Sequence, residues 1–178
     1  MNHSFPEALV VLKAQTGCDR SFEQLHENYA GQLKGFVISI AGAEHAEDIL
    51  QETWLSAYQR ISTLTSPRAF KKWLFTLARN KSIDKVRVLN RVEFEQIPDE
   101  MPDTAQTGPE LEEDKLALFQ KLASTLPDAH REVAYLFYKQ SFTVEEISII
   151  SGIPPGTVKS RLHTARQLLM SKSQENKR

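Results

Sequence analysis

Residues 143–169 have the pattern of two helices joined by a tight turn. Thr143 and Glu146 stand three positions apart, the spacing of a capping box in which each side chain satisfies a backbone group at the start of a helix. Gly152 supplies the backbone freedom needed to leave that helix, and Pro155 suits the first position of the next one, where its missing N–H does no harm. So sharp a break between two helices predicts a helix-turn-helix.

The second helix of this pair has one apolar and one polar face. Its apolar residues recur at intervals of four, three and four, which places them on the buried side: Val158, Leu162, Ala165 and Leu169. The outer face carries hydroxyl, basic and imidazole side chains: Thr157, Lys159, Ser160, Arg161, His163, Thr164 and Arg166. Such a helix fits the major groove of DNA, which is about 12 Å wide. The alternative is an amphipathic hairpin whose basic face is merely solvated.

Charge is segregated along the chain. The 178 residues have a net charge of −1, but residues 1–91 carry 12 Lys/Arg against 9 Asp/Glu, residues 92–114 carry none against 9, and residues 115–178 carry 10 against 5. Attraction to phosphate is local, because physiological salt screens charges beyond about 8 Å. The near-neutral balance of the whole chain therefore does not exclude nucleic acid as a partner.

The acidic segment 92–114 contains three prolines, one glycine and no regular apolar period, which is typical of an extended linker. It separates two predicted helical domains, residues 1–91 and 115–178. Strand-like alternation is missing from the sequence, so we expect an all-α fold. The single cysteine, Cys18, and the lack of a signal peptide or of ~18 consecutive apolar residues predict a cytoplasmic protein without membrane insertion.

In the first domain we expect helices over about residues 6–15, 21–42 and 43–62, the second opening with a capping box formed by Ser21 and Gln24. The third should bury a broad apolar stripe that includes Tyr58. Its opposite face gathers acidic and amide side chains around one leucine, within roughly a 100° arc: Asp48, Gln51, Glu52, Leu55 and Gln59. This face is either a protein-docking surface or ordinary exposed surface.

A fourth helix should begin with Ser66 as its cap and Pro67 at its first position, and extend to about residue 91. Its predicted inward residues are Phe70, Trp73, Leu74 and Leu77. On the other side Arg68, Lys71, Lys72 and Arg79 form a basic stripe with Phe75 among them, which suits a nucleic-acid strand unless the face is simply solvated. Past Asn80 the pattern changes, since Lys81 and Lys85 turn back toward the apolar side. Periodicity does not predict how that half packs.

The last domain should add helices over about residues 110–124 and 127–140 to the helix pair, the latter with Val133, Leu136 and Phe137 inward. At this point three segments together resemble the extracytoplasmic-function group of bacterial sigma factors. Residues 46–58 (AEDILQETWLSAY) resemble the family's region 2.2, residues 70–87 (FKKWLFTLARNKSIDKVR) its regions 2.3 and 2.4, and residues 126–169 its region 4.

The resemblance implies an alternative sigma factor that binds core RNA polymerase, directs it to promoters and assists DNA melting. Asp48, Gln51, Glu52 and Leu55 would dock on the coiled coil of the β′ clamp, and region 4 on the β flap. The −10 element would be contacted by the loop at residues 62–65 and by Lys72, Arg79, Asn80, Lys81 and Arg87. At the −35 element, Lys159, Ser160, His163 and Thr164 would lie near base edges, while Thr143, Thr157, Arg161 and Arg166 would hold phosphates.

The sequence predicts no catalytic site. The five histidines lack the spacing of a metal site, no glycine-rich phosphate loop is present, and Glu47 and Asp48 point to different helical sides. We therefore expect no cofactor, no metal and no small-molecule substrate. An anti-sigma factor is the further protein partner that the resemblance implies.

The sequence is also compatible with two other classes of function. A helix-turn-helix transcription regulator would explain residues 143–169 but not the basic fourth helix, and a sigma-like decoy would bind only an anti-sigma factor. The acidic segment also has two interpretations. Its carboxylates could thread the basic RNA channel of the polymerase in place of nucleic acid, or it could be a solubilising tether.

Overall fold

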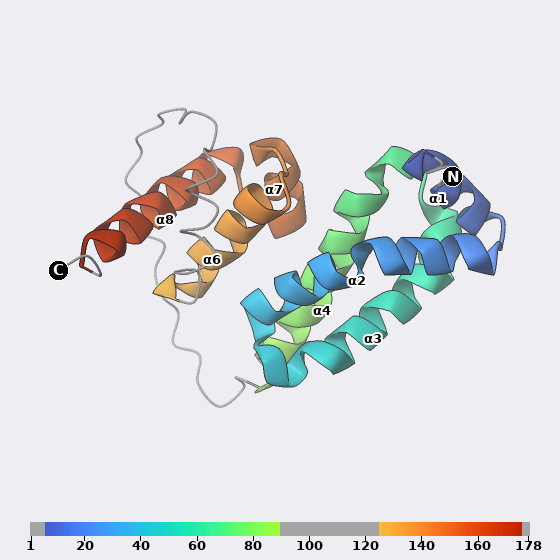
Figure 1. Ribbon diagram of the computed structural model, residues 1–178, viewed down its shortest axis with the longest axis horizontal. Coiled ribbons are helices and arrows are strands. Elements are labelled where there is room, and N and C mark those ends of the chain that lie inside the picture. The colour runs from blue at the N-terminus through green and yellow to red at the C-terminus, as the bar shows by residue number, and fades with distance from the viewer. Residues whose placement is uncertain (1–5, 90–124, 176–178) are drawn as a thin grey trace. The chain divides into compact units, whose positions relative to one another are not determined.

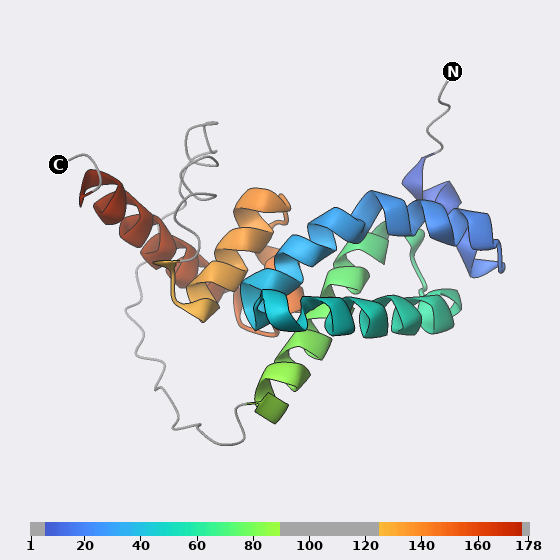
Figure 2. The same ribbon diagram turned by 60° about the horizontal axis from the view of Figure 1, so that its bottom comes forward.

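The computed structural model describes residues 6–89 and 125–175. The chain divides into two compact units, residues 1–89 and residues 90–178. Every regular element among the described residues is a helix or a helical turn, which confirms the predicted all-α fold class (Figures 1 and 2). The linker predicted at residues 92–114 and the helix predicted at residues 110–124 lie outside the described residues.

In the first unit, α3 and α4 pack against α2 and against each other, while α1 packs on α2 and on the turns that precede α4. Figure 2 shows α2 and α3 meeting at one end, where Gly42 joins them. The elements are α1 (Glu7–Gln15), α2 (Asp19–Ala41), α3 (Ala43–Arg60), the 3-10 turns η1 (Ile61–Thr63) and η2 (Pro67–Ala69), and α4 (Phe70–Leu89).

Apolar side chains from all four helices form the core of this unit. On α2 they follow the predicted spacing of three and four residues, which keeps Leu25, Tyr29, Leu33 and Phe36 on one buried face. The other helices contribute Val11 of α1, Ile49 and Ala57 of α3, and Phe70, Leu74 and Phe75 of α4. The amide of Gln15 fastens α1 to the segment before α4, because its Nε2 donates to the carbonyl oxygens of Ile61 (3.1 Å) and Leu64 (2.6 Å).

The predicted start of the second helix was wrong. α2 begins at Asp19 with Cys18 at the N-cap, so Ser21 lies inside the helix rather than before it. Ser21 is buried, and its hydroxyl donates to Cys18 Sγ at 3.3 Å instead of capping a backbone N–H. Ser21 and Gln24 have the spacing of a capping box, but the helix starts about one turn before the position that this spacing predicts.

In the second unit, α8 packs against both α6 and α7. The described elements are α6 (Asp128–Ala134), the π-turn η5 (Tyr135–Lys139), α7 (Val144–Ser151) and α8 (Pro155–Glu175). Leu126 and Ala134 meet Ala165 and Leu169 of α8 in a buried cluster, against which Tyr135 and Tyr138 are packed. The predicted inward residues of α8 are buried at Val158, Ala165 and Leu169 and partly buried at Leu162.

The helix predicted over residues 127–140 is interrupted. From Tyr135 the chain widens into a π-turn, in which the Gln140 N–H donates to the Tyr135 carbonyl oxygen at 3.3 Å. The extra residue in this turn rotates the side chains that follow it. Leu136 is fully buried as predicted, whereas Phe137, also predicted inward, is only partly buried.

Candidate protein and nucleic-acid interfaces

The predicted acidic arc lies on the outer face of α3. Asp48, Gln51, Glu52 and Leu55 are all exposed, and Leu55 has 58% of its surface accessible. The opposite face of the helix holds Ile49, Thr53 and Ala57, which are buried. Burial of that face fixes the rotation of α3 and presents a single large apolar side chain among carboxylate and amide groups. We call Asp48, Gln51, Glu52 and Leu55 the α3 face.

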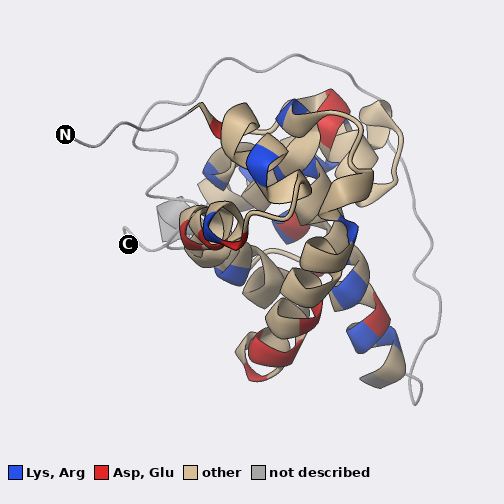
Figure 3. Ribbon diagram, turned by 90° about the vertical axis from the view of Figure 1, so that its right-hand side faces the viewer, with Lys and Arg blue, Asp and Glu red and all other residues tan. Residues whose placement is uncertain are grey.

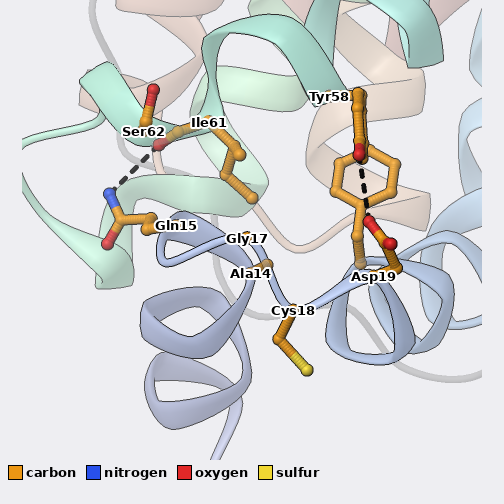
Figure 4. A pocket seen from close by; sticks show the side chains of 9 residues that line it. Ala14, Gln15, Gly17, Cys18, Asp19, Tyr58, Ile61 and Ser62 are labelled. Carbon is orange, nitrogen blue, oxygen red and sulfur yellow. Dashed lines mark hydrogen bonds between the residues drawn. The ribbon is translucent and has the colours of Figure 1, made fainter.

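Tyr58 extends this exposed region, although the sequence predicted it in the buried stripe. It is 53% exposed, its ring meets Phe22 edge-on at 5.1 Å, and its hydroxyl donates to Asp19 Oδ1 at 2.9 Å (Figure 4). That hydrogen bond to a carboxylate raises the pKa of Tyr58. A surface pocket lies beside this pair, and residues at the corner between α1 and α2, Gly17 and Cys18, line it together with Ile61 and Ser62 (Figure 4).

The basic residues assigned to the −10 element lie along α4. Asn80 and Arg87 are exposed, and Lys72, Arg79 and Lys81 are partly exposed. The prediction that Phe75 lies among them on the surface was wrong. Its side chain is 0% exposed and packs 5.1 Å from the ring of Phe36 on α2. Because α4 packs on both α2 and α3, it buries a wider arc than one stripe.

Trp73, predicted to face inward, is only partly buried. Its side chain has intermediate accessibility, with the ring 5.9 Å from that of Phe70. Phe75 therefore adds no exposed aromatic ring to the cations of α4. Of the aromatic side chains of this helix, Trp73 is the one that keeps accessible surface.

Two ion pairs join α4 to the α3 face. Lys81 Nζ lies 3.4 Å from Glu52 Oε2, and Lys85 Nζ lies 3.5 Å from Asp48 Oδ2. Figure 3 shows the blue bands of α4 beside the red bands of α3. These contacts explain the change of pattern past Asn80, since both lysines turn toward carboxylates of a neighbouring helix rather than toward solvent. In the Lys81–Glu52 pair, a residue assigned to DNA is thus in direct contact with one assigned to polymerase.

The capping box predicted for α7 is confirmed. Thr143 Oγ1 accepts from the Glu146 N–H at 3.2 Å, and Glu146 Oε2 accepts from the Thr143 N–H at 3.0 Å. Thr143 is exposed, but its backbone N–H is already used by this contact. Only its hydroxyl hydrogen could be donated to a phosphate.

The turn between α7 and α8 has the predicted chemistry. Gly152 adopts a left-handed conformation with φ 66°, and its N–H donates to the Ser148 carbonyl oxygen at 2.9 Å. Ser148 Oγ reinforces the turn by donating to the Ile153 carbonyl oxygen at 2.6 Å. The helix ends here and α8 starts at Pro155.

The outer face of α8 carries the residues assigned to the −35 element. Lys159 and His163 are exposed and stand one helical turn apart, so their side chains project from the same side. The remaining five are partly exposed: Thr157, Ser160, Arg161, Thr164 and Arg166. Burial raises the pKa of Tyr138, while the nearby positive charge of Arg166 opposes that rise. Arg166 therefore lies near Tyr138 in the π-turn η5.

The described residues contain no group of three or more His, Cys, Asp or Glu side chains able to hold a metal ion. Within the same residues, no helix combines the length and the apolar character needed to cross a membrane.

Two family models match the chain. The one described as Sigma-70 region 2 matches residues 25–92, and the one described as Sigma-70, region 4 matches residues 116–169. The first therefore covers α3 and α4, and the second covers the helix-turn-helix.

Curated proteins and solved structures give the same assignment. The chain is 33% identical over 156 residues to the ECF RNA polymerase sigma factor SigL of Mycobacterium tuberculosis, covering 85% of this chain and 88% of that protein. It is 30% identical over 152 residues to the ECF RNA polymerase sigma factor RpoE of Cereibacter sphaeroides, covering 83% of each. Its structure is similar to that of the sigma factor RpoE of Bartonella quintana, solved in complex with the anti-sigma factor NepR, with a TM-score of 0.65, 28% identity, and coverage of 85% and 96% of the two chains.

Proposed function

This chain belongs to the extracytoplasmic-function group of the sigma-70 family of RNA polymerase sigma factors, and on that premise we propose how it directs transcription as an alternative sigma factor. It binds core RNA polymerase in the cytoplasm, brings the enzyme to promoters through their −35 and −10 elements, and helps to open the DNA. Residues 1–91 serve as region 2 and residues 115–178 as region 4, joined by the acidic linker. The protein acts by binding alone, without a cofactor.

Core polymerase docks on the α3 face through the coiled coil of its β′ clamp, and region 4 contacts the β flap. The exposure of Leu55 among carboxylates and amides supports this assignment. Burying this exposed apolar side chain against a partner removes apolar surface from water, and the carboxylates around it favour a cationic partner.

The −10 element is held by the cations of α4 and by the loop at residues 62–65. Lys72, Arg79, Lys81 and Arg87 neutralise phosphates while Asn80 donates or accepts at a base edge. Capturing an unpaired base costs a few kcal/mol of lost stacking, which these contacts must offset. Because Phe75 is buried, the base is not stacked on its ring.

The −35 element is read by α8, and the observation that carries the proposal is the geometry of the α7–α8 pair. The capping box and the left-handed Gly152 set the two helices as a helix-turn-helix, and α8 presents Lys159 and His163 on its exposed side. Ser160 and Thr164 complete the base-reading group. Thr143, Thr157, Arg161 and Arg166 hold phosphates and set the register on the duplex.

A protein inhibitor is the further partner in this proposal. The similar sigma factor of Bartonella quintana was solved with an anti-sigma factor bound. By extension, an anti-sigma factor sequesters this chain until transcription of its promoters is required.

Titration of the fluorescently labelled chain with core polymerase tests the docking step. We expect saturable binding, weakened about 5- to 30-fold by Leu55→Ala, which corresponds to a loss of about 1 to 2 kcal/mol of binding free energy. Leu12→Ala is the matched control, since Leu12 is a similarly exposed leucine on α1, and it should leave the affinity unchanged. Failure of the unmodified chain to bind, or equal losses in both variants, would contradict the proposal. Binding to an anti-sigma factor alone would indicate a decoy.

A further inference from the structure

The contact between α3 and α4 pairs residues to which the proposed function gives different partners. Asp48 and Glu52 belong to the α3 face and are assigned to polymerase, whereas Lys81 is assigned to the −10 element. Lys81 pairs with Glu52 at 3.4 Å, and Lys85, one helical turn further along α4, pairs with Asp48 at 3.5 Å. The two lysine side chains are about one third exposed, at 36% and 34%, while the two carboxylates are well exposed, at 61% and 71%.

This arrangement has an electrostatic consequence for DNA binding. A carboxylate within 4 Å of an ammonium group cancels most of its attraction for a distant phosphate, because the carboxylate repels that phosphate nearly as strongly as the ammonium attracts it. In the free chain, Lys81 and Lys85 therefore contribute little to the basic character of α4. A partner that brings its own cations to Asp48 and Glu52 competes for the same carboxylates and releases both lysines.

We infer that the ion pairs with Asp48 and Glu52 keep Lys81 and Lys85 from binding DNA in the free chain. Docking of polymerase on the α3 face breaks these pairs, and both lysines then bind the phosphates of the −10 strand. The inference rests on the proposed function and adds Lys85 to the DNA-binding residues. It makes polymerase and DNA binding mutually reinforcing at one helix pair. Because such coupling is reciprocal, promoter DNA also favours retention of the polymerase.

The coupling is modest because exposed ion pairs are weak. Each such pair typically contributes 0.2 to 1 kcal/mol, so two pairs together correspond to about a 2- to 30-fold change in DNA affinity. A change in this range favours promoter binding by the polymerase-bound chain over promoter binding by the free chain. Higher salt should reduce the effect, since it screens both the pairs and the phosphates.

The free chain provides the first test. Its affinity for a fluorescent single strand carrying a −10 sequence is measured at about 50 mM salt, a concentration at which phosphate contacts are strong. We expect the double variant Asp48→Asn, Glu52→Gln to bind about 2- to 30-fold more tightly than the unmodified chain. The control is Glu27→Gln, Glu47→Gln, which removes the same charge from exposed positions of α2 and α3. An equal gain in the control, or no gain in either, would overturn the inference.

The assembled holoenzyme provides the second test. Lys85→Met removes the charge and keeps most of the aliphatic stem. It should weaken DNA binding more in the presence of core polymerase than in its absence, because only then is the lysine released. Equal losses in the two conditions would overturn the inference. If the unmodified chain does not bind polymerase, the proposed function fails and the switch with it, while the free-chain comparison still decides whether the carboxylates mask the lysines.

Discussion

At the scale of single residues, Gly42 determines the corner between α2 and α3. Its backbone has φ 84° and ψ 164°, a region essentially limited to glycine, and a Cβ there would lie 2.6 Å from the Glu44 carboxylate. The α3 face depends on this corner, because the direction in which the chain leaves α2 determines how α3 is aligned for packing.

Gly42→Ala should therefore destabilise the first unit by about 1 to 3 kcal/mol. Gly31→Ala is the matched control, since Gly31 lies within α2 with nothing near its Cβ position, and it should stabilise the same unit by up to ~1 kcal/mol through helix propensity. Urea unfolding followed by tryptophan fluorescence measures both, because both tryptophans, Trp54 and Trp73, belong to this unit. Unfolding curves that shift in the same direction would contradict the role given to Gly42.

Cys18 offers a second prediction at this scale. The hydroxyl and backbone of Ser21 donate hydrogen bonds that favour the thiolate and lower the pKa of Cys18. The pH midpoint of Cys18 alkylation should lie below that of a cysteine in an unstructured peptide, and Ser21→Ala should raise it. Ser62→Ala, in the same pocket, should leave it unchanged. An unaltered midpoint in Ser21→Ala would show that this hydrogen bond does not act on the thiol.

At the scale of elements, helices and turns were predictable wherever local chemistry determines them. Thr143, Glu146 and Gly152 define the helix-turn-helix through contacts within a few residues, so their pattern is visible in the sequence. Phe75 was misplaced because its burial depends on a ring of α2, Phe36, which lies far away in the sequence. Periodicity assumes one buried stripe per helix and fails for α4, which packs on two partners.

The candidate site likewise contains residues whose exposure was predictable from the sequence and residues whose contacts were not. Exposure of the α3 face followed from helical spacing alone, whereas Lys81 and Lys85 could not be placed because their partners are on another helix. The pattern change past Asn80 was the available signal, and it showed that the lysines turned back without showing toward what. Tyr58 was misplaced for a related reason, since its exposed hydroxyl has its partner, Asp19, on α2.

The capping box supports a prediction about α7. Glu146→Ala should lower its local stability by about 0.5 to 2 kcal/mol, because the Thr143 N–H loses its acceptor. Glu145→Ala is the control: it also removes a first-turn carboxylate but leaves the box intact. Amide hydrogen exchange across residues 144–151 measures the difference. Similar loss of protection in both variants would mean that the helix dipole, not the hydrogen bond, stabilises this end.

The exposed side of α8 supports a prediction about sequence readout. Lys159→Ala should cost about 1 to 3 kcal/mol on the preferred promoter and relax the preference at one position of the −35 element. Arg166→Ala should instead weaken binding by a similar factor on all sequences, as expected for a phosphate contact. Holoenzyme affinities for a set of single-position promoter variants measure both. A uniform loss for Lys159→Ala would contradict base reading by that side chain.

At the scale of the whole molecule, the proposed function divides two DNA elements between two compact units of one chain. Residues 1–91 and 115–178 carry excess positive charge, and residues 92–114 carry nine acidic side chains and no basic ones. The excess is small in each case, +3 and +5, so few phosphate contacts are available to either unit alone. Promoter recognition should therefore depend on the polymerase. By holding both units on the same DNA molecule, the polymerase makes the second contact intramolecular, so that the binding free energies of the two units combine.

Transcription by purified core polymerase on a library of promoter sequences, with and without this chain, tests that central claim most directly. We expect start sites that occur only when the chain is added and that share one sequence at the −35 and another at the −10 position. Identical transcripts in the two reactions, with the chain folded and free of inhibitors, would contradict it.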